Sequence, residues 1–161
     1  SRLPLQLLTF SSFDLDFARP FVERRLSDLN IVMLSRVHAF PCAPKNSFSF
    51  TFSRALRHLK TLHPTIDAVL TYVNPNLGFR GTSYRAANWV PLAEEPVTYL
   101  YAGGEYTTFR SIAAASVSGT SDALRVQART LSVSRVPLLP LRVFAYPVST
   151  RAKGSLAEGR D

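Results

Sequence analysis

The amino-acid sequence predicts an α/β fold in which helices cross over a central sheet. Two observations support this prediction. Segments of strand-type composition alternate with segments whose apolar residues recur at helical spacing, in the order strand, loop, helix, strand, loop, helix, strand. The chain has 161 residues, of which 46% are hydrophobic and 19% charged, so it is long and apolar enough to fold around its own core.

The first predicted elements are two strands with a helix between them. Residues 3–13 are apolar with strand-type composition. Residues 14–26 carry apolar side chains on one helical face, with Pro20 either near the start of that helix or kinking it. Residues 30–40 are rich in Ile, Val and Phe and predict a buried strand, which Pro41 ends.

Residues 45–63 predict the clearest helix of the chain. Asn46 or Ser47 can cap its start, and Pro64 stops it. A continuous apolar stripe along this helix is formed by Phe48, Phe52, Ala55, Leu56, Leu59 and Leu62.

The next strand, at residues 66–73, is predicted to be buried on both faces, because apolar residues follow one another with little alternation. A turn-rich loop over 74–78 and a short helix over 80–88 follow. Further strands are predicted at 90–92, 98–101 and 105–109, the last two forming a hairpin.

The C-terminal part gives a weaker pattern. Its predicted elements are a loop over 113–121, a helix over 122–131, a final edge strand over 138–148 interrupted by two prolines, and a flexible tail over 150–161. We therefore expect a single domain over residues 1–149.

The basic excess has an unusual composition. The formal net charge is +8, and 16 of the 19 positive residues are Arg. Arg presents a planar fork of donors that suits phosphate and also stacks on bases, so a nucleic-acid partner is one interpretation. The other interpretation is a GC-rich genome that favours Arg codons, although codon usage does not account for the net charge.

Several classes of protein are excluded or disfavoured by the same composition. With Cys42 as the single cysteine, an internal disulfide framework and a cysteine-based zinc cluster are excluded. No apolar run approaches the roughly 20 residues of a membrane span, and no secretory pattern stands at the start. No His, Asp or Glu cluster has a convincing ligand spacing, so no metal site is predicted. We expect a cytoplasmic protein.

Two strand-to-helix junctions are candidates for chemistry. At residues 42–47 a strand leads into a helix whose first N–H groups are unpaired, and Lys45 adds a positive charge that suits phosphate. Ordinary helix capping explains this junction equally well. At residues 74–81, Asn74 and Asn76 place amide side chains at the carboxyl end of a strand, where ligands of α/β sheets gather. A turn that simply favours Asn, Pro and Gly is the alternative.

The second junction also carries a family resemblance. Residues 84–90, Tyr-Arg-Ala-Ala-Asn-Trp-Val, resemble the Tyr-x-x-x-Gly-Phe-x signature of the GNAT acyltransferases. Residues 70–89 are more specifically similar to the Mom family of phage DNA-modification proteins, which is related to GNAT: a strand, an Asn-Pro turn, Gly-x-x-Gly and Tyr-x-Ala-x-Asn-Trp. The upstream Ala-Pro-Lys-Asn at 43–46 with its amphipathic helix also fits, so the resemblance covers roughly residues 37–89.

This resemblance implies a GNAT-like mixed central sheet flanked by helices. It also implies an enzyme that transfers an acyl-derived or methylcarbamoyl-type group to adenine N6 in DNA, with acetyl-CoA or a related acyl donor. Such a phage or prophage protein would act in the host cytoplasm and protect phage DNA from restriction.

The resemblance further implies roles for individual residues. Tyr84 is the expected proton donor to the leaving thiolate, a role that suits a phenol of pKa about 10, whereas a packed core tyrosine is the alternative. The other residues expected to line the pocket are Asn76 and Ser83. Apart from the resemblance, His38 lies on a strand expected to run beside the pocket and is a candidate base or metal ligand, with ordinary packing as the alternative. The expected cofactor-binding residues are Lys45, Asn46, Ser47 and Asn74. The expected DNA-binding residues are Arg80, Arg85, Arg110 and Arg142.

Two departures from the family patterns limit these expectations. Residues 42–50 contain no glycine, although the GNAT phosphate loop uses glycines to approach the pyrophosphate, so the cofactor is held differently or an ordinary acyl-CoA is not the donor. Asn74 stands where Mom-like proteins often carry Asp, which places a carboxylate role in doubt. Farther along, Glu94-Glu95-Pro96 has the composition of a solvated turn.

Two other functions remain open from the sequence. One is a GNAT-fold acetyltransferase that acts on a small amine or a protein, and the other is a basic nucleic-acid-binding protein without catalysis.

Overall fold

The computed structural model describes residues 5–12, 26, 28–96, 100–102, 105–107, 132–133 and 138–157. The chain divides into two compact units. The first comprises Ser1–Glu95 together with Leu141–Asp161, and the second comprises Pro96–Pro140. Each unit is described by itself.

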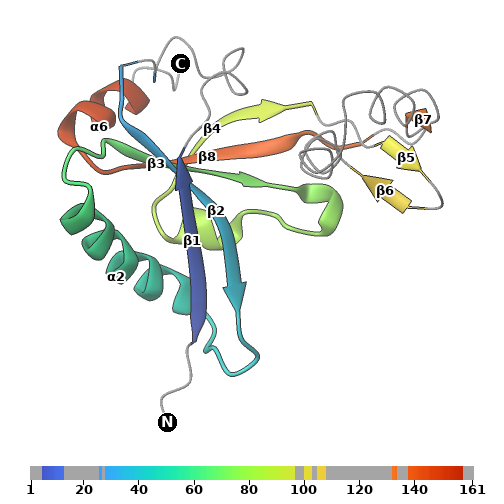
Figure 1. Cartoon of the computed structure of the whole chain (residues 1–161), viewed down its shortest axis with the longest axis horizontal. Coiled ribbons are helices and arrows are strands. Elements are labelled where there is room, and N and C mark those ends of the chain that lie inside the picture. Colours follow the sequence, from blue (N-terminus) through green and yellow to red (C-terminus); the bar gives the residue numbers. More distant parts are fainter. Residues whose placement is uncertain are drawn as a thin grey trace, which may run out of the picture. The chain divides into compact units, whose positions relative to one another are not determined.

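The first unit is built on a mixed five-stranded sheet in the order β1-β2-β3-β8-β4 (Figure 1). Its strands are β1 (Gln6–Ser12), β2 (Ile31–Ala39), β3 (Ala68–Val73), β8 (Leu141–Pro147) and β4 (Val90–Glu95). β2 and β3 are parallel, whereas the other neighbouring pairs are antiparallel. The predicted α/β class is confirmed.

Helices cover both faces of this sheet. On one face, helix α2 (Ser47–Leu62), the 3-10 turn η1 (Pro75–Leu77) and helix α3 (Thr82–Ala86) follow β2 and β3 in the chain. Helix α6 (Thr150–Ala157) follows β8 and belongs to the other face. Alternation along β3 separates the two cores: Val69 packs with α2, and Leu70 packs with α6.

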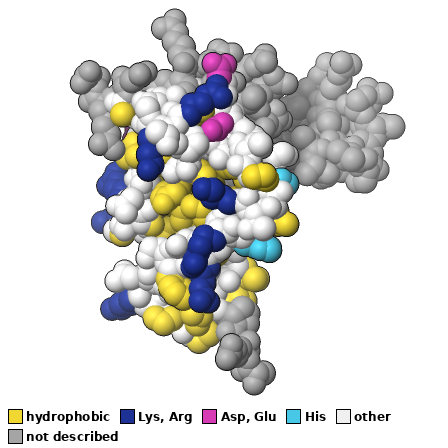
Figure 2. Space-filling model, turned by 90° about the vertical axis from the view of Figure 1, so that its left-hand side faces the viewer, with side chains coloured by type: hydrophobic (Ala, Val, Ile, Leu, Met, Phe, Trp, Pro, Cys, Tyr) yellow, Lys and Arg dark blue, Asp and Glu magenta, His cyan; other side chains and the backbone are white. Residues whose placement is uncertain are grey.

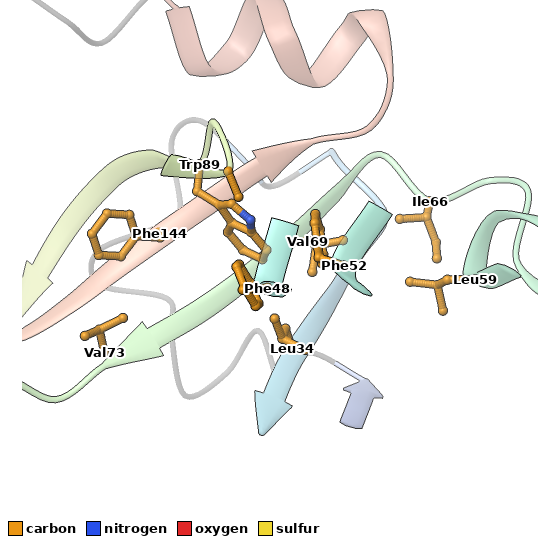
Figure 3. Packing of buried hydrophobic residues seen from close by; sticks show 10 residues of the cluster. Leu34, Phe48, Phe52, Leu59, Ile66, Val69, Val73, Trp89 and Phe144 are labelled. Carbon is orange, nitrogen blue, oxygen red and sulfur yellow. The ribbon is translucent and has the colours of Figure 1, made fainter. Parts of the chain in front are cut away.

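The larger core is aromatic (Figure 3). The ring of Phe52 lies 4.9 Å from that of Trp89 and 5.0 Å from that of Tyr146, measured between centroids. Phe48 and Phe144 complete the same cluster. The helical spacing that predicted α2 therefore identifies its buried Phe48, Phe52 and Leu59 correctly, but Leu62, the last residue of the predicted stripe, is 60% exposed.

The start of α2 differs from the prediction. Asn46 is the N-cap residue but adopts the left-handed conformation, with φ 63°, and no side chain caps the helix. Predicted capping by Asn46 or Ser47 is therefore wrong, because the left-handed backbone turns the Asn46 side chain away from the first-turn amides.

The C-terminal elements also differ from the prediction. β8 is not an edge strand, because it lies between β3 and β4. Pro140 precedes it and Pro147 is its last residue, so neither proline removes a hydrogen bond from the strand interior. The first eight residues of the predicted tail form α6, whose Ala152 and Leu156 are buried in the core.

The second unit contains a three-stranded sheet in the order β6-β5-β7. Its strands are β5 (Leu100–Ala102), β6 (Glu105–Thr107) and β7 (Ser132–Val133). β5 and β6 are antiparallel neighbours, as the predicted hairpin requires. The elements predicted over 113–121 and 122–131, and nearly all of the helix predicted over 14–26, lie outside the described residues.

Gly81 gives a prediction about stability. It has φ +74° at the start of α3, and a Cβ built there would lie 2.6 Å from the fully buried ring of Phe144. Gly78 has φ +81° but no atom within 4 Å of such a Cβ. We expect Gly78→Ala to cost about 1–2 kcal/mol from backbone strain alone. Gly81→Ala should cost about 1–3 kcal/mol more because of overpacking. Urea unfolding followed by fluorescence of the single tryptophan measures both, and equal losses would contradict the argument.

Asp67, which lies just before β3, gives a prediction about pH. Ser149 Oγ donates to its carboxylate at 2.6 Å and the Asn30 N–H at 3.0 Å, and these hydrogen bonds lower the pKa of Asp67. The stabilisation is therefore present above the unfolded pKa of about 3.9 and is lost as the pH falls through the folded pKa. Because the Asp67 carboxylate is partly exposed and its interactions are screened by solvent, Asp67→Asn should lower the free energy of unfolding by about 0.5–1 kcal/mol at pH 7.

The measurement is urea unfolding of the wild type and Asp67→Asn between pH 7 and pH 3, where the difference should shrink as the pH falls. Ser149 Oγ also accepts from the Ala152 N–H at 3.1 Å, at the start of α6. Ser149→Ala should therefore cost less in the Asp67→Asn background than in the wild type, because only the wild type loses the hydrogen bond to Asp67 as well. A pH-independent difference or full additivity would contradict this assignment.

Candidate active-site groove between two diverging strands

The site begins where two parallel strands separate. The ladder between β2 and β3 covers three residue pairs, the last of them Met33 with Leu70, and no further pairing joins the two strands. Beyond it, β1 and β2 run in one direction and β3, β8 and β4 in another (Figure 1). The register between β1 and β2 shifts at Thr9 and Phe10, where Ser35 is extra on β2 and its hydroxyl donates to the Thr9 carbonyl at 3.0 Å. A bulge of this kind bends a strand.

A side chain takes over where the backbone pairing stops. The buried Thr71 hydroxyl, on β3, donates to the Leu34 carbonyl of β2 at 2.9 Å. This bond gives a partner to a buried carbonyl that lies beyond the last residue pair of the β2–β3 ladder. Thr71 also lowers the pKa of the nearby Tyr84 phenol, which partly offsets the effect of burial.

A groove of about 920 Å³ occupies the opening. Arg36 and His38 of β2 line one wall, Thr71 and Tyr72 of β3 line the other, and Asn74 follows at the end of β3. Ser83 and Tyr84 of α3 also line the groove. The structure thus brings together four of the residues singled out from the sequence, namely Tyr84, Ser83, His38 and Asn74.

Tyr84 is held among aromatic rings. Its ring lies 5.0 Å from Phe48, 5.2 Å from Trp89 and 5.8 Å from Phe144, measured between centroids. Burial raises the pKa of Tyr84. The side chain therefore remains a neutral phenol over the physiological pH range and can supply a proton.

Asn76 lies beside the groove rather than in it. Its exposed side chain and its backbone N–H both donate to Asn74 Oδ1 at 3.0 Å. Asn76 is not among the residues that line the groove, whereas Asn74 is. The arrangement lets Asn76 orient Asn74 instead of contacting a bound molecule directly.

A smaller hollow of about 150 Å³ adjoins the groove at the start of α2. The two hollows share Gln6, Phe48 and Ser83 among their lining residues. Asn46 and Ser47 line the small hollow, whereas Lys45 is exposed nearby and does not. The Ser47 N–H donates to the Pro44 carbonyl at 3.2 Å. Because no side chain caps α2, the first-turn amides that follow Ser47 remain available to an anion.

Gln6 carries an unsatisfied atom between the two hollows. Its Nε2 donates to Ser47 Oγ at 3.0 Å. Its Oε1 is buried and has no hydrogen-bond partner in the described part of the chain. An orphaned buried acceptor costs free energy unless a donor reaches it, so this atom is suited to a ligand N–H.

Three of the four predicted DNA-binding arginines lie near one another. Arg85 and Arg142 line a hollow of about 290 Å³, and an Arg142 Nη1 hydrogen bond of 3.5 Å reaches the carbonyl of Arg80. Glu94 lies in the same hollow, 3.7 Å from Arg142 Nε. This acid offsets part of the positive charge. Arg110 lies outside the described residues.

Some residues of the groove escaped the sequence analysis. Thr71 and Gln6 are two of them, and Thr71 left a signal as the one aliphatic hydroxyl in the strand run Ala-Val-Leu-Thr-Tyr-Val. Glu95 does not line the groove but holds Tyr72, which does: Glu95 is 6% exposed rather than solvated, and the Tyr72 hydroxyl donates to its Oε1 at 3.1 Å. Burial raises the pKa of Glu95. No local sequence signal distinguishes Glu95 from its exposed neighbour Glu94.

Two features are absent from the described residues. These residues contain no group of three or more His, Cys, Asp or Glu side chains placed to hold a metal ion. None of the helices in the described part of the chain is long and apolar enough to span a membrane.

Comparison with known proteins gives one match. The sequence model of a family described as the Mom protein family matches residues 12–157, most of the chain. None of the curated proteins matches it.

The environment of Tyr84 predicts its titration. Because burial raises its pKa, the neutral form stabilises the fold fully below the unfolded pKa of about 10, and this stabilisation is lost as the pH rises through the folded pKa. The ultraviolet difference titration between the wild type and Tyr84→Phe should therefore show one phenol that ionises above pH 10. A difference signal that titrates at or below that pH would contradict the buried, neutral assignment.

Proposed function

Because the chain belongs to the Mom protein family, we propose that it is a DNA-modifying transferase. Membership in this family connects the chain with phage DNA modification in general. The specific reaction proposed is transfer of an acyl-derived or methylcarbamoyl-type group from a CoA-type donor to N6 of adenine, which protects phage DNA from restriction.

The observation that carries this proposal is the groove between the diverging strands. A transfer reaction needs room for a donor and an acceptor side by side, and a volume of about 920 Å³ provides it. The groove also has a half-buried neutral phenol, Tyr84, and an imidazole, His38, among its lining residues. An acid and a base in one cleft suit a reaction that moves one proton to a leaving group and removes another from a nucleophile.

The residues near α2 fit a CoA-type donor. The GNAT phosphate turn uses glycine, but here Asn46 itself adopts the left-handed conformation, so the turn forms without glycine. Successive N–H groups around such a turn attract anions. The first-turn amides near Ser47 would hold the pyrophosphate with the charge of Lys45 nearby, and Gln6 Oε1 would accept from an amide of the donor arm. When bound, the donor supplies the activated carbonyl carbon.

The proposed proton movements use two side chains. His38, exposed on the β2 wall, takes the proton that the adenine amine loses on attack. Tyr84 Oη gives its proton to the departing thiolate, and the proton that His38 has gained restores it through solvent. Asn74, held by Asn76, and Ser83 provide hydrogen bonds that orient the two substrates.

Support for a DNA acceptor comes from the rim of the groove. Leu77 and Phe79 line it and are exposed, which suits a flat apolar base. Arg80, Arg85 and Arg142 lie on or close to α3, and together with Arg110 they are the proposed contacts to phosphates near that base. A base within a duplex must be extruded at a cost of a few kcal/mol.

Nucleoside analysis of DNA from cells that express the chain tests the function. Mass spectrometry of digested DNA should reveal a mass-shifted adenine nucleoside, and Tyr84→Phe should lower its yield by about a hundredfold or more. Tyr146→Phe is the matched control, because this tyrosine packs against Phe52 and Trp89 without lining the groove.

Each outcome separates this function from the alternatives. Unaltered nucleosides under active expression would overturn the proposal. Turnover of acetyl-CoA on a small amine without DNA would indicate an ordinary acetyltransferase, and salt-sensitive DNA binding without any new nucleoside would indicate a non-catalytic binding protein.

A further inference from the structure

The outward side of α2 carries a row of exposed cations. Arg54, Arg57 and Lys60 follow one another at three-residue spacing and lie opposite the buried Phe48, Phe52 and Leu59. Figure 2, which faces the side of the molecule where α2 lies in Figure 1, shows Lys and Arg side chains running down this surface. Acidic side chains are visible only at its upper end.

The sequence around this row is free of acids. Between Asp28 and Asp67 the chain has no Asp or Glu, and it has five Arg or Lys residues and all three histidines. The structure shows no ion pair at Arg54, Arg57 or Lys60 among its described residues. The positive potential of this face is therefore not neutralised locally.

An exposed aromatic ring belongs to the same face. Phe50 is 57% exposed, and the guanidinium of Arg54 lies over its ring, 4.9 Å from the centroid. Stacking restricts the guanidinium in position, so that less side-chain freedom is lost when its N–H groups bind a phosphate. We name Phe50, Arg54, Arg57 and Lys60 the α2 basic face.

The arginines beside α3 differ from those of the α2 basic face because an acidic side chain lies close to them. Arg142 is 3.7 Å from Glu94, and both line the same hollow. A polyanion meets an acid there, whereas the described part of the chain places no ion-pairing acid on the α2 basic face. A row of cations on a rigid 16-residue helix suits a partner with regularly spaced negative charges along a stiff backbone.

We propose that the α2 basic face binds the phosphate backbone of duplex DNA and holds it independently of sequence. This inference rests on the proposed function for the choice of DNA as the polyanion. Contacts of this kind fix the orientation of a protein on a duplex without reading its bases. The surface is separate from the arginines near α3, and it would supply affinity whereas the groove supplies the reaction.

Fluorescence anisotropy with a labelled duplex of random sequence tests the surface. Arg54→Gln/Arg57→Gln removes two charges with little change in helix propensity. Its matched control is Arg151→Gln/Lys153→Gln, which removes two charges from exposed positions of α6. Circular dichroism of both double variants verifies that the helices remain.

The quantity that tests the proposal is the slope of log K for DNA binding against the logarithm of the salt concentration. Each phosphate contact contributes about 0.9 to this slope, so the α2 double variant should lower its magnitude by about 1.8 and the α6 double variant by almost nothing. Equal losses in both variants, or an unchanged slope in the α2 variant, would overturn the proposal. So would binding of the wild type to vesicles of anionic phosphatidylglycerol but not to DNA.

The outcome can be separated from that of the proposed function. If the wild type modifies DNA but the Arg54→Gln/Arg57→Gln variant has the same salt slope as the wild type, the proposed surface is wrong and the proposed function stands. A chain that binds DNA through α2 but produces no new nucleoside supports the surface and overturns the function.

Discussion

The hydrogen bond from the Thr71 hydroxyl to the Leu34 carbonyl marks the point on which the rest of the site depends. Parallel strands normally continue their ladder to a common end, but β2 and β3 separate after three residue pairs. The bulge at Ser35 turns β2 away together with β1, and β3 remains with β8. Without the Thr71 hydroxyl, the separation would leave a buried carbonyl unpaired. The two strands can diverge and leave a groove because the Thr71 hydroxyl pairs with the Leu34 carbonyl at the point where they separate.

The same constraint explains why the groove is rigid where its chemistry lies. Thr71 also interacts with the Tyr84 phenol, and the ring of Tyr84 packs against Phe48 of α2 and Phe144 of β8. A flexible phenol would lose entropy on every reaction cycle, whereas this one is held by three elements before any substrate arrives. The open side of the groove is polar or exposed, and its closed end is built from the aromatic core.

Local periodicity predicted most of the fold but not the pairing of distant segments. The strands at β2 and β3 and the helix α2 follow from patterns within ten to twenty residues, and the structure confirms them. The position of β8 could not be derived in this way, because only its partners show that its two prolines stand at its ends. α6 was missed for a related reason, since two small or apolar contacts, Ala152 and Leu156, anchor a short helix of modest amphipathicity. In the site, Tyr84, Ser83, His38 and Asn74 were expected to be close and are. Thr71 and Gln6 were missed because their roles exist only across strand and helix boundaries.

The pairing of Glu95 with Leu141 has a consequence for how this chain can change over time. Residues 96–140 leave the main sheet from the end of β4 and return to it at the neighbouring position on β8, so they form a detour between two adjacent points. Such a segment can lengthen, shorten or be exchanged for another without altering a strand order or breaking a pair in the five-stranded sheet. Homologous chains are thus free to diverge there while the strand order that forms the groove between β2 and β3 stays the same.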